Sequence, residues 1–191
     1  MSTAVAPART GQVLADLIPA SRVRDVALVV GGAALTGLAA QIAVPVPGSP
    51  VPVTGQTFAA LLVGTSLGAR RGVASLALYA LAGLAGLPWF AQGTSGFSVS
   101  FGYILGMILA SAAVGALARR GADRNVWRTA GAMLAGEAII YAVGVPYLAY
   151  AADLSLSAAV AAGLTPFLFG DALKAALAMG LLPSAWKLLK R

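Results

Sequence analysis

The chain of 191 residues contains no cysteine and no histidine. Without cysteine it can form no disulfide, no thiolate metal site and no thiol nucleophile. Without histidine it lacks the commonest metal ligand and the commonest general base. The phosphate-binding pattern GxxxxGK[ST] is absent as well, so the chain has no ATP-hydrolysing site of that type. These absences argue against most metal-dependent and nucleophilic enzymes.

Charged residues are scarce. They make up 10% of the chain, against 59% hydrophobic residues, and the mean hydropathy is +0.87. A soluble domain carries about 25% charged residues, so this chain has too few charges to cover a globule in water. The composition therefore predicts a membrane protein, and the length is that of one domain.

Six apolar stretches follow one another along the chain, each near the length that a helix needs to cross a bilayer. They cover residues 26–44, 53–69, 72–87, 100–118, 129–150 and 165–182. The second is the shortest, and its proline-rich approach, PVPGSPVPVTGQ, predicts an extended entry packed against protein. The expected fold is an all-α polytopic membrane protein with six transmembrane helices.

Basic residues lie almost entirely on one side of these six stretches. With the N-terminus inside, the inner segments hold twelve of the 13 lysines and arginines, and the outer loops hold none. This asymmetry predicts that both termini are cytoplasmic, and it explains the net charge of +7 without nucleic acid. The inner basic residues are Arg9, Arg22, Arg24, Arg70, Arg71, Arg119, Arg120, Arg124, Arg128, Lys187, Lys190 and Arg191.

The expected domain division is a cytoplasmic leader over residues 1–25 and a single six-helix membrane domain over residues 26–189. No continuous apolar segment precedes the first arginines of the leader, so we do not expect a cleaved signal peptide. Aromatic residues are expected near the membrane boundaries, as in an interfacial belt. They are Trp89, Tyr103, Tyr147 and Tyr150 on the outer side, and Trp127 and Trp186 on the inner side.

Three ionisable side chains lie inside the apolar stretches: Glu137, Asp171 and Lys174. Such groups are costly in a membrane and usually mark a functional path or site. Asp171 and Lys174 are three residues apart, which places them on one face of a helix. The plainer alternative is an ion pair that fastens this helix to its neighbours. Glu137 has a structural alternative too, as a neutral group or a partner of Lys174, with Tyr141 one turn away.

The two polar loops, VPVTGQTF and AQGTSGFSVS, face the same outer side as this charged pair. Their glycines free backbone N–H groups that can bind a small polar molecule. The inner halves of the stretches are uniformly apolar. The pattern predicts a pocket open to the outside, not a continuous polar pore. The alternative for each loop is an ordinary connector.

Three segments carry a resemblance to a known family. VPVTGQTFAALLVGTSLGARRGVASLALYALAGLAGLPWF (residues 51–90) resembles the signature of BioY proteins. SFGYILGMILA (100–110) is similar to the family's glycine-tyrosine entry to helix four, and PFLFGDALKAALA (166–178) to its GD-x-x-K helix six. The resemblance covers residues 25–185.

BioY proteins are the biotin-binding substrate (S) components of energy-coupling factor (ECF) transporters. The resemblance therefore implies a six-helix bundle in the bacterial cytoplasmic membrane, surrounded by lipid, that captures biotin with high affinity from outside. It implies a transmembrane scaffold (T) subunit and two ATPase (A) subunits as partners. It implies neither enzymatic activity nor a cofactor in this chain.

The resemblance also implies that Asp171 and Lys174 contact biotin, with the loop around Gln92 and Gly93. Asp171 could accept from the ureido N–H groups, and Lys174 could donate to the ureido carbonyl. The outer loops hold no Lys or Arg for the valerate carboxylate. Backbone N–H groups with hydroxyls such as Ser98 would then bind it, or Lys174 would do so with the ligand reversed. The remaining expected contacts are Thr54 and Gln56 at the mouth, and Tyr103 and Tyr147 as apolar walls, with Trp89 and Phe97.

The first apolar stretch contains small residues four apart in GGAALTGLAAQIA. Gly32, Thr36 and Ala40 form one helical row, and Leu35, Ala39 and Ala43 form the next. BioY proteins use an alanine-rich face here to meet the scaffold subunit, which implies that role for Ala39 and Ala43. Internal packing of the bundle is the alternative.

Three functional hypotheses follow. The first is a biotin-binding S component that needs ATPase partners for uptake. The second is a solitary transporter of the same fold, for biotin or another vitamin, working without them. The third is a membrane enzyme using Glu137 or Asp171, which the lack of histidine and cysteine disfavours.

Overall fold

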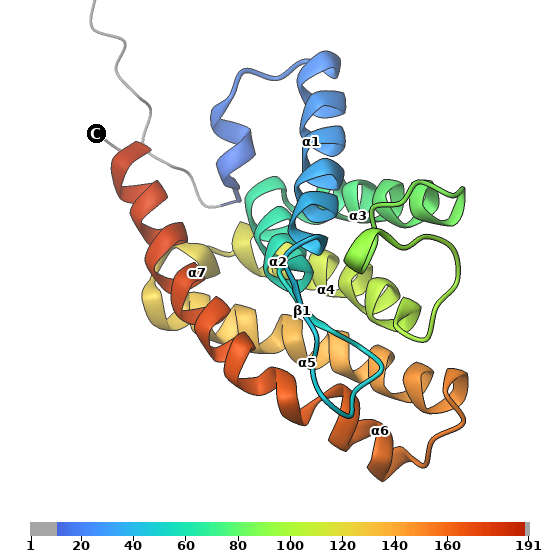
Figure 1. The fold of residues 1–191 in the computed structure, drawn as a ribbon. Helices are drawn as coiled ribbons and strands as arrows, with labels where there is room; N and C mark the ends of the chain where they lie inside the picture. Colours follow the sequence, from blue (N-terminus) through green and yellow to red (C-terminus); the bar gives the residue numbers. More distant parts are fainter. Residues whose placement is uncertain (1–10, 190–191) are drawn as a thin grey trace, which may run out of the picture.

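The computed structural model describes residues 11–189, which are mostly helical (Figure 1). This confirms the all-helical fold class. The α-helices are α1 (Arg22–Ala40), α2 (Gln56–Leu67), α3 (Ala69–Leu84), α4 (Phe101–Arg119), α5 (Val126–Ala151), α6 (Leu156–Gly163) and α7 (Leu168–Leu189). Short 3-10 turns are η1 (Leu14–Leu17), η2 (Ala91–Gly93), η3 (Ala122–Arg124) and η4 (Thr165–Phe167).

The proline-rich segment after α1 forms a small hairpin. β1 (Ala43–Val44) pairs antiparallel with β2 (Val53–Thr54), and Ala43 lies opposite Thr54. The prediction of an extended entry before the second helix is therefore confirmed. Prolines between the strands prevent a helix there. Figure 1 shows this hairpin crossing in front of α5.

Each of the six apolar stretches contains an α-helix, but the boundaries differ from the predicted ones. α1 begins earlier, at Arg22, because the Ser21 hydroxyl accepts a hydrogen bond from the Arg24 N–H (3.0 Å) and caps the helix there. α6 was not predicted; Ser155 caps it by accepting from the Ala158 N–H (3.2 Å). α7 was expected to end near Pro183 but continues to Leu189 with that proline inside it. Proline is tolerated in membrane helices where neighbouring helices accommodate the lost backbone hydrogen bond.

Among residues 11–189, four helical stretches have the length and hydropathy of membrane-spanning helices. They are α1, α4, α5 and the continuous stretch Leu156–Leu189 that contains α6, η4 and α7. α2 is apolar but shorter. Large apolar side chains also cover the outside of the bundle, for example Leu173, Leu177 and Leu181, each more than half exposed at intervals of one helical turn on α7. Such a surface suits lipid and confirms a membrane protein.

Glycines allow the central helices to approach one another closely. α4 and α5 form the most extensive helix pair, and Gly106 of α4 lies directly against the Ile140 backbone of α5. A methyl group on Gly115 would lie only 2.3 Å from the backbone nitrogen of Ala69, where α2 passes into α3. Small residues at these crossings bring the polar side chains of different helices within hydrogen-bond distance.

The segment from Gly11 to Leu17 folds back onto the end of the bundle where α3 begins and α4 ends. Val13 is fully buried and Ala15 is 4% exposed. Asp16 of η1 accepts from Arg71 (2.8 Å) and lies 3.5 Å from Arg119. In Figure 1, η1 and the end of α7 lie on the same side of the molecule, opposite α6. Arg9, Lys190 and Arg191 of the predicted inner set lie outside the described residues.

Two residues of the expected aromatic belt are exposed and two are buried. Trp127 and Tyr150 are exposed (79% and 87%), as expected of residues at a membrane boundary. Trp186 and Tyr103 are buried instead. Trp186 donates to Asp123 (2.6 Å), and the Tyr103 hydroxyl donates to the Gly163 carbonyl oxygen (2.8 Å). Both are structural links between segments far apart in the sequence.

Candidate ligand-binding site

A connected polar network forms where the first turn of α7 meets α2 and α5. Lys174 Nζ lies 3.0 Å from Asp171 Oδ1, so the predicted pairing on one helix face is present. Lys174 also donates to the Thr57 hydroxyl of α2 (2.9 Å). The Tyr141 hydroxyl of α5 donates to Asp171 Oδ2. The carboxylate thus receives donors from two sides while 91% of its side chain is shielded.

This network forms one wall of a small pocket that opens to solvent. The other walls come from the hairpin, the loop before α4, α4 itself and η4. The lining residues are Val51, Pro52, Thr54, Gln56, Thr57, Phe90, Ala91, Ser100, Tyr103, Ile104, Met107, Tyr141, Phe167, Asp171 and Lys174.

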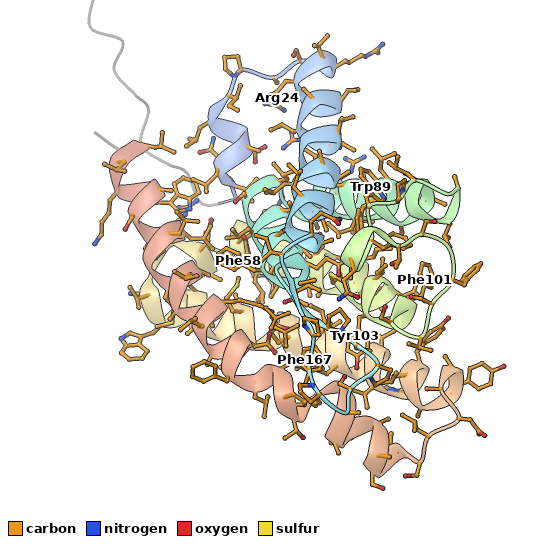
Figure 2. All side chains as sticks on the ribbon, viewed as in Figure 1. Arg24, Phe58, Trp89, Phe101, Tyr103 and Phe167 are labelled. Atoms are coloured by element: carbon orange, nitrogen blue, oxygen red, sulfur yellow. The ribbon has the colours of Figure 1, made fainter. Side chains whose placement is uncertain are left out.

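Five of the nine predicted ligand contacts line this pocket: Thr54, Gln56, Tyr103, Asp171 and Lys174. They come from the hairpin and from α2, α4 and α7, so the tertiary structure brings together segments up to 120 positions apart. Gln56 is buried and donates its side-chain N–H to the Tyr79 hydroxyl. Figure 2 shows Tyr103 and Phe167 near the centre of the molecule, and both belong to the pocket lining.

Four predicted contacts lie outside the pocket lining: Gln92, Gly93, Ser98 and Tyr147. Gln92 and Gly93 are exposed in η2 with left-handed backbone (φ 58° and 70°). Their neighbours Phe90 and Ala91 line the pocket instead. The Ser98 hydroxyl pairs with that of Ser100 (3.0 Å), which does line it.

Tyr147 is a packing residue between two helices. A methyl group on Gly102 would lie 2.2 Å from its Cβ, so the side chain fills the space that the glycine leaves. The ring also packs edge-to-face on Phe101, with centroids 6.4 Å apart. The side chain contributes to the α4–α5 contact, one layer behind the pocket.

Sequence reasoning missed several lining residues. Thr57 is part of the VPVTGQTF segment, but nothing in that segment indicates that Lys174 is its partner. Tyr141 was considered as a partner of Glu137 and instead donates to Asp171. On α4 a detectable signal existed: Ser100, Tyr103, Ile104 and Met107 follow the i, i+3, i+4, i+7 spacing of one helical face.

Glu137 lies behind the pocket wall and does not line it. It is 8% exposed, and within residues 11–189 no donor reaches its Oε2 atom. The alternative of a direct pair with Lys174 is not realised, because the lysine is bonded to Asp171 and Thr57. The Thr57 hydroxyl stands between them and interacts with the Glu137 carboxyl.

The polar groups of the pocket lie mainly on one wall. A carboxylate, an ammonium group and two hydroxyls gather at one wall, opposite rings and aliphatic side chains such as Phe90, Ile104 and Met107. Such a site suits a small molecule with closely spaced donors and acceptors on an otherwise apolar body. Within the described residues, no group of three or more His, Cys, Asp or Glu side chains could hold a metal ion.

The small-residue face predicted on the first helix is present only in part. α1 ends at Ala40, so Ala43 is not on the same helical row as Ala39; it lies in β1. Ala39 is half-buried, with its carbonyl oxygen close to Gly55. Gly32, Thr36 and Ala40 are buried within the bundle, which matches the alternative of internal packing for that row. Leu35 and Leu38 remain exposed beside Ala39.

Comparison with known proteins places the chain in a family. The sequence model of the BioY family matches residues 10–191. "Biotin transporter BioY2" of Lactococcus lactis subsp. cremoris (strain MG1363) is 34% identical over 160 residues, covering 82% of this chain and 87% of the relative. "Biotin transporter BioY" of Thermotoga maritima is 35% identical over 135 residues, covering 69% and 78%.

A solved structure has the same fold. It is a crystal structure of the S-component for biotin from an ECF-type ABC transporter, with a TM-score of 0.77 and 20% sequence identity, covering 91% of this chain and 96% of that one. All three of these proteins are transporters or transporter components, which agrees with the prediction that this chain is not an enzyme. The family match extends along nearly the whole chain and includes the segments around Thr54 and Asp171, so the chain belongs to the BioY family.

Proposed function

We propose that this BioY chain is the biotin-binding S component of an ECF-type, ATP-driven transporter in the bacterial cytoplasmic membrane. The observation that carries the proposal is the pocket in which Asp171, Lys174, Thr57 and Tyr141 form one hydrogen-bonded wall. The names of the family's transporters and the matching fold of a biotin S-component support it.

The donors and acceptors of this wall suit a ureido group. Asp171 offers carboxylate oxygens to the two N–H groups, and charge-assisted bonds of this kind are the strong ones. Lys174 offers N–H donors to the carbonyl oxygen. The bicyclic ring would then lie against apolar lining such as Met107 and Phe167. The valerate carboxylate would point toward the mouth, where Ser100 and the backbone near Ala91 supply donors.

The reversed pose places the valerate carboxylate at Lys174. Since Gln92, Gly93 and Ser98 lie outside the lining, fewer loop groups are available for a carboxylate at the mouth than the sequence suggested. Biotin amides with a neutral tail distinguish the two poses. Loss of tight binding in the amide together with tolerance of Asp171→Asn would support the reversed pose.

Binding of biotin to the detergent-purified chain tests the function directly. We expect tight binding by isothermal calorimetry, and a loss of about 1.5–3 kcal/mol, or about 10–150-fold, in Asp171→Asn. Asn keeps the shape of the side chain but has one acceptor oxygen in place of two. The matched control is Asp153→Asn, since Asp153 is exposed and lies outside the pocket. A wild-type protein that ignores biotin would contradict the proposal.

The proposed topology has six membrane spans in residues 26–189, a cytoplasmic leader in residues 1–25 and both termini inside. The basic ends of α1, α3, α4 and α5 lie on the side where the leader docks, and the pocket opens on the other. A biotin-binding site on the outer side is consistent with capture from the medium.

Uptake would require the T and two A subunits, because the chain has no phosphate-binding loop of its own. We assign the exposed side of α1 around Ala39, with Leu35 and Leu38, to contact with the T subunit, and Ala43 to its margin. Uptake of labelled biotin by cells that contain this chain but no A or T subunit tests the requirement. Accumulation in those cells would instead favour a solitary transporter.

A further inference from the structure

Glu137 is a buried carboxyl group that the proposed binding chemistry does not use. It lies on α5, is 8% exposed, and among residues 11–189 no donor reaches its Oε2 atom. A buried carboxylate oxygen without a hydrogen bond is costly, and in a membrane the cost is larger still. The molecule must therefore compensate this oxygen in some other way.

The charges around the pocket do not balance. Asp171 and Glu137 would together carry two negative charges, and Lys174 carries one positive charge. Lys174 and Asp171 form an ion pair at 3.0 Å, so their charges cancel and the charge of an ionised Glu137 is not neutralised by this pair. An uncompensated charge in a low-dielectric interior is strongly unfavourable, so a positive charge or a proton must join the group.

Within residues 11–189, the elements packed against Glu137 supply no positive charge besides Lys174. Near it, α7 supplies the charges of Asp171 and Lys174, and α5 itself supplies the phenol of Tyr141. α4 carries no charged residue before Arg119, which lies at its C-terminal end. From α2 the neutral hydroxyl of Thr57 reaches the carboxyl. α6 has no charged residue, and the charged residues of η3 belong to the opposite, inner end of α5.

The proton belongs on Glu137 because the donors belong to Asp171. Both oxygens of Asp171 accept hydrogen bonds, Oδ1 from Lys174 and Oδ2 from Tyr141. The carboxylate of Asp171 thus has two donors, whereas Glu137 Oε2 has none within residues 11–189. Glu137 has only the Thr57 hydroxyl, which itself accepts from Lys174. A relay from Lys174 through Thr57 therefore connects the pocket to the Glu137 carboxyl.

We propose that Glu137 carries an exchangeable proton and that the pocket binds its anionic ligand together with that proton. This rests on the proposed function. When the pH rises, the proton leaves Glu137 Oε2 for water and a negative charge appears behind the pocket wall. That charge repels an anion and draws Lys174, through Thr57, away from the ligand. Affinity for biotin should therefore fall as the pH rises.

The test measures the dissociation constant of biotin against pH for the purified full chain and for Glu137→Gln. Between about pH 6 and pH 9 a carboxylic acid ligand stays ionised, so the ligand adds no change of its own. We expect the dissociation constant of the wild type to rise with pH, with a slope that approaches about tenfold per pH unit. Glu137→Gln, a neutral isostere, should match the wild type near pH 6 and show no slope.

A second measurement does not depend on the variant. Calorimetry of the wild type in buffers with different ionisation enthalpies counts the protons taken up with biotin. Uptake that approaches one proton per biotin at high pH supports the proposal. Tight binding with no proton uptake overturns this inference but leaves the proposed function intact. Equal slopes in wild type and Glu137→Gln also overturn it. Replacing sodium by choline should change nothing, and a sodium dependence would assign the compensation to a cation instead. No biotin binding at any pH would overturn the proposed function and this inference together.

Discussion

Asp171 accepts hydrogen bonds from two side chains on different helices, and this double contact fixes the direction of its carboxylate. Tyr141 holds Oδ2 from α5, and Lys174 holds Oδ1 from the next turn of α7. With both oxygens engaged, the carboxylate has a defined direction before any ligand arrives. A preorganised acceptor needs less ordering on binding, which increases affinity.

Removal of the Tyr141 hydroxyl tests this orientation. We expect Tyr141→Phe to weaken biotin binding by about 1–2 kcal/mol, because the variant loses a hydrogen bond to a charged group and leaves Asp171 less restrained. The control is Tyr150→Phe, since Tyr150 is 87% exposed. Calorimetric titration with biotin measures both. Equal affinities for the two variants would show that Tyr141 does not position the carboxylate.

At the scale of secondary-structure elements, the pocket depends on how closely the helices cross. α4 forms extensive contacts with α2, α3 and α5, and several of these depend on glycine. Gly115 meets the α2–α3 junction, where Gly68 has a φ of 81° and lets one helix end and the next begin. Thr57 and Tyr103 lie at the opposite, N-terminal ends of the same two helices, where they line the pocket.

Substitution of Gly115 by Ala should destabilise the bundle. The added methyl group would lie 2.3 Å from the Ala69 nitrogen, and both partners are backbone, so the helices must separate. Overpacking of this kind costs about 1–3 kcal/mol. Gly131→Ala is the matched control, since nothing lies within 4 Å of a methyl group there. Thermal unfolding in detergent should show a lower midpoint for Gly115→Ala only.

The docking of η1 should depend on pH through Asp16. Burial acts to raise the pKa of Asp16, but the Arg71 guanidinium, the Val13 N–H and Arg119 outweigh it and lower the pKa below its ordinary value. A lowered pKa means that the stabilisation is fully present above the unfolded value, about pH 4, and is lost as the pH falls through the folded pKa.

Asp16→Asn should therefore lower the melting temperature at neutral pH and match the wild type in acid. The ion pairs are partly exposed, so we expect a difference of about 1 kcal/mol or less, or about 2–4 °C. Asp153→Asn, at an exposed position, serves as the control. Melting curves recorded at several pH values measure the difference. A gap that persists at the lowest pH would mean that Asp16 acts through packing instead of charge.

At the scale of the whole molecule, charge separates the two ends of the bundle. Arg71, Arg119 and Arg124 gather with the leader at one end, and the pocket mouth with its uncharged loops lies at the other. A bilayer that retains basic residues on the cytoplasmic side would orient the pocket outward. The apolar side chains exposed between the two ends would face lipid.

Introduced cysteines test this orientation without background, because the chain has none of its own. In intact cells a membrane-impermeant maleimide should label Ser95→Cys and Ser157→Cys, whose positions are exposed near the outer end. Arg120→Cys, exposed at the inner end, should be labelled only after permeabilisation. Labelling of the Arg120 position in intact cells would contradict the proposed topology.

The sequence by itself determined the membrane class, the all-helical fold and five of the fifteen residues that line the candidate pocket. Lipid exposure can be predicted from composition alone, because so few charged residues cannot cover a globule in water. Helix positions follow from apolar run length, and the GD-x-x-K spacing places Asp171 and Lys174 on one face whatever surrounds them. The length of the apolar stretches did not predict α6, which Ser155 caps. It also did not predict the end of α7, because the helix continues through Pro183.

Only the tertiary structure decided which residues meet across helices. Tyr141 lies 30 positions from Asp171, and Thr57 lies 117 positions from Lys174. Their contacts depend on the rotation and crossing of α2, α5 and α7. Close packing at glycines sets this arrangement, and residue spacing along the chain does not encode it. The rotation of α5 also buries Glu137 near Thr57, whereas Gln92 stays exposed because it lies in the separate turn η2.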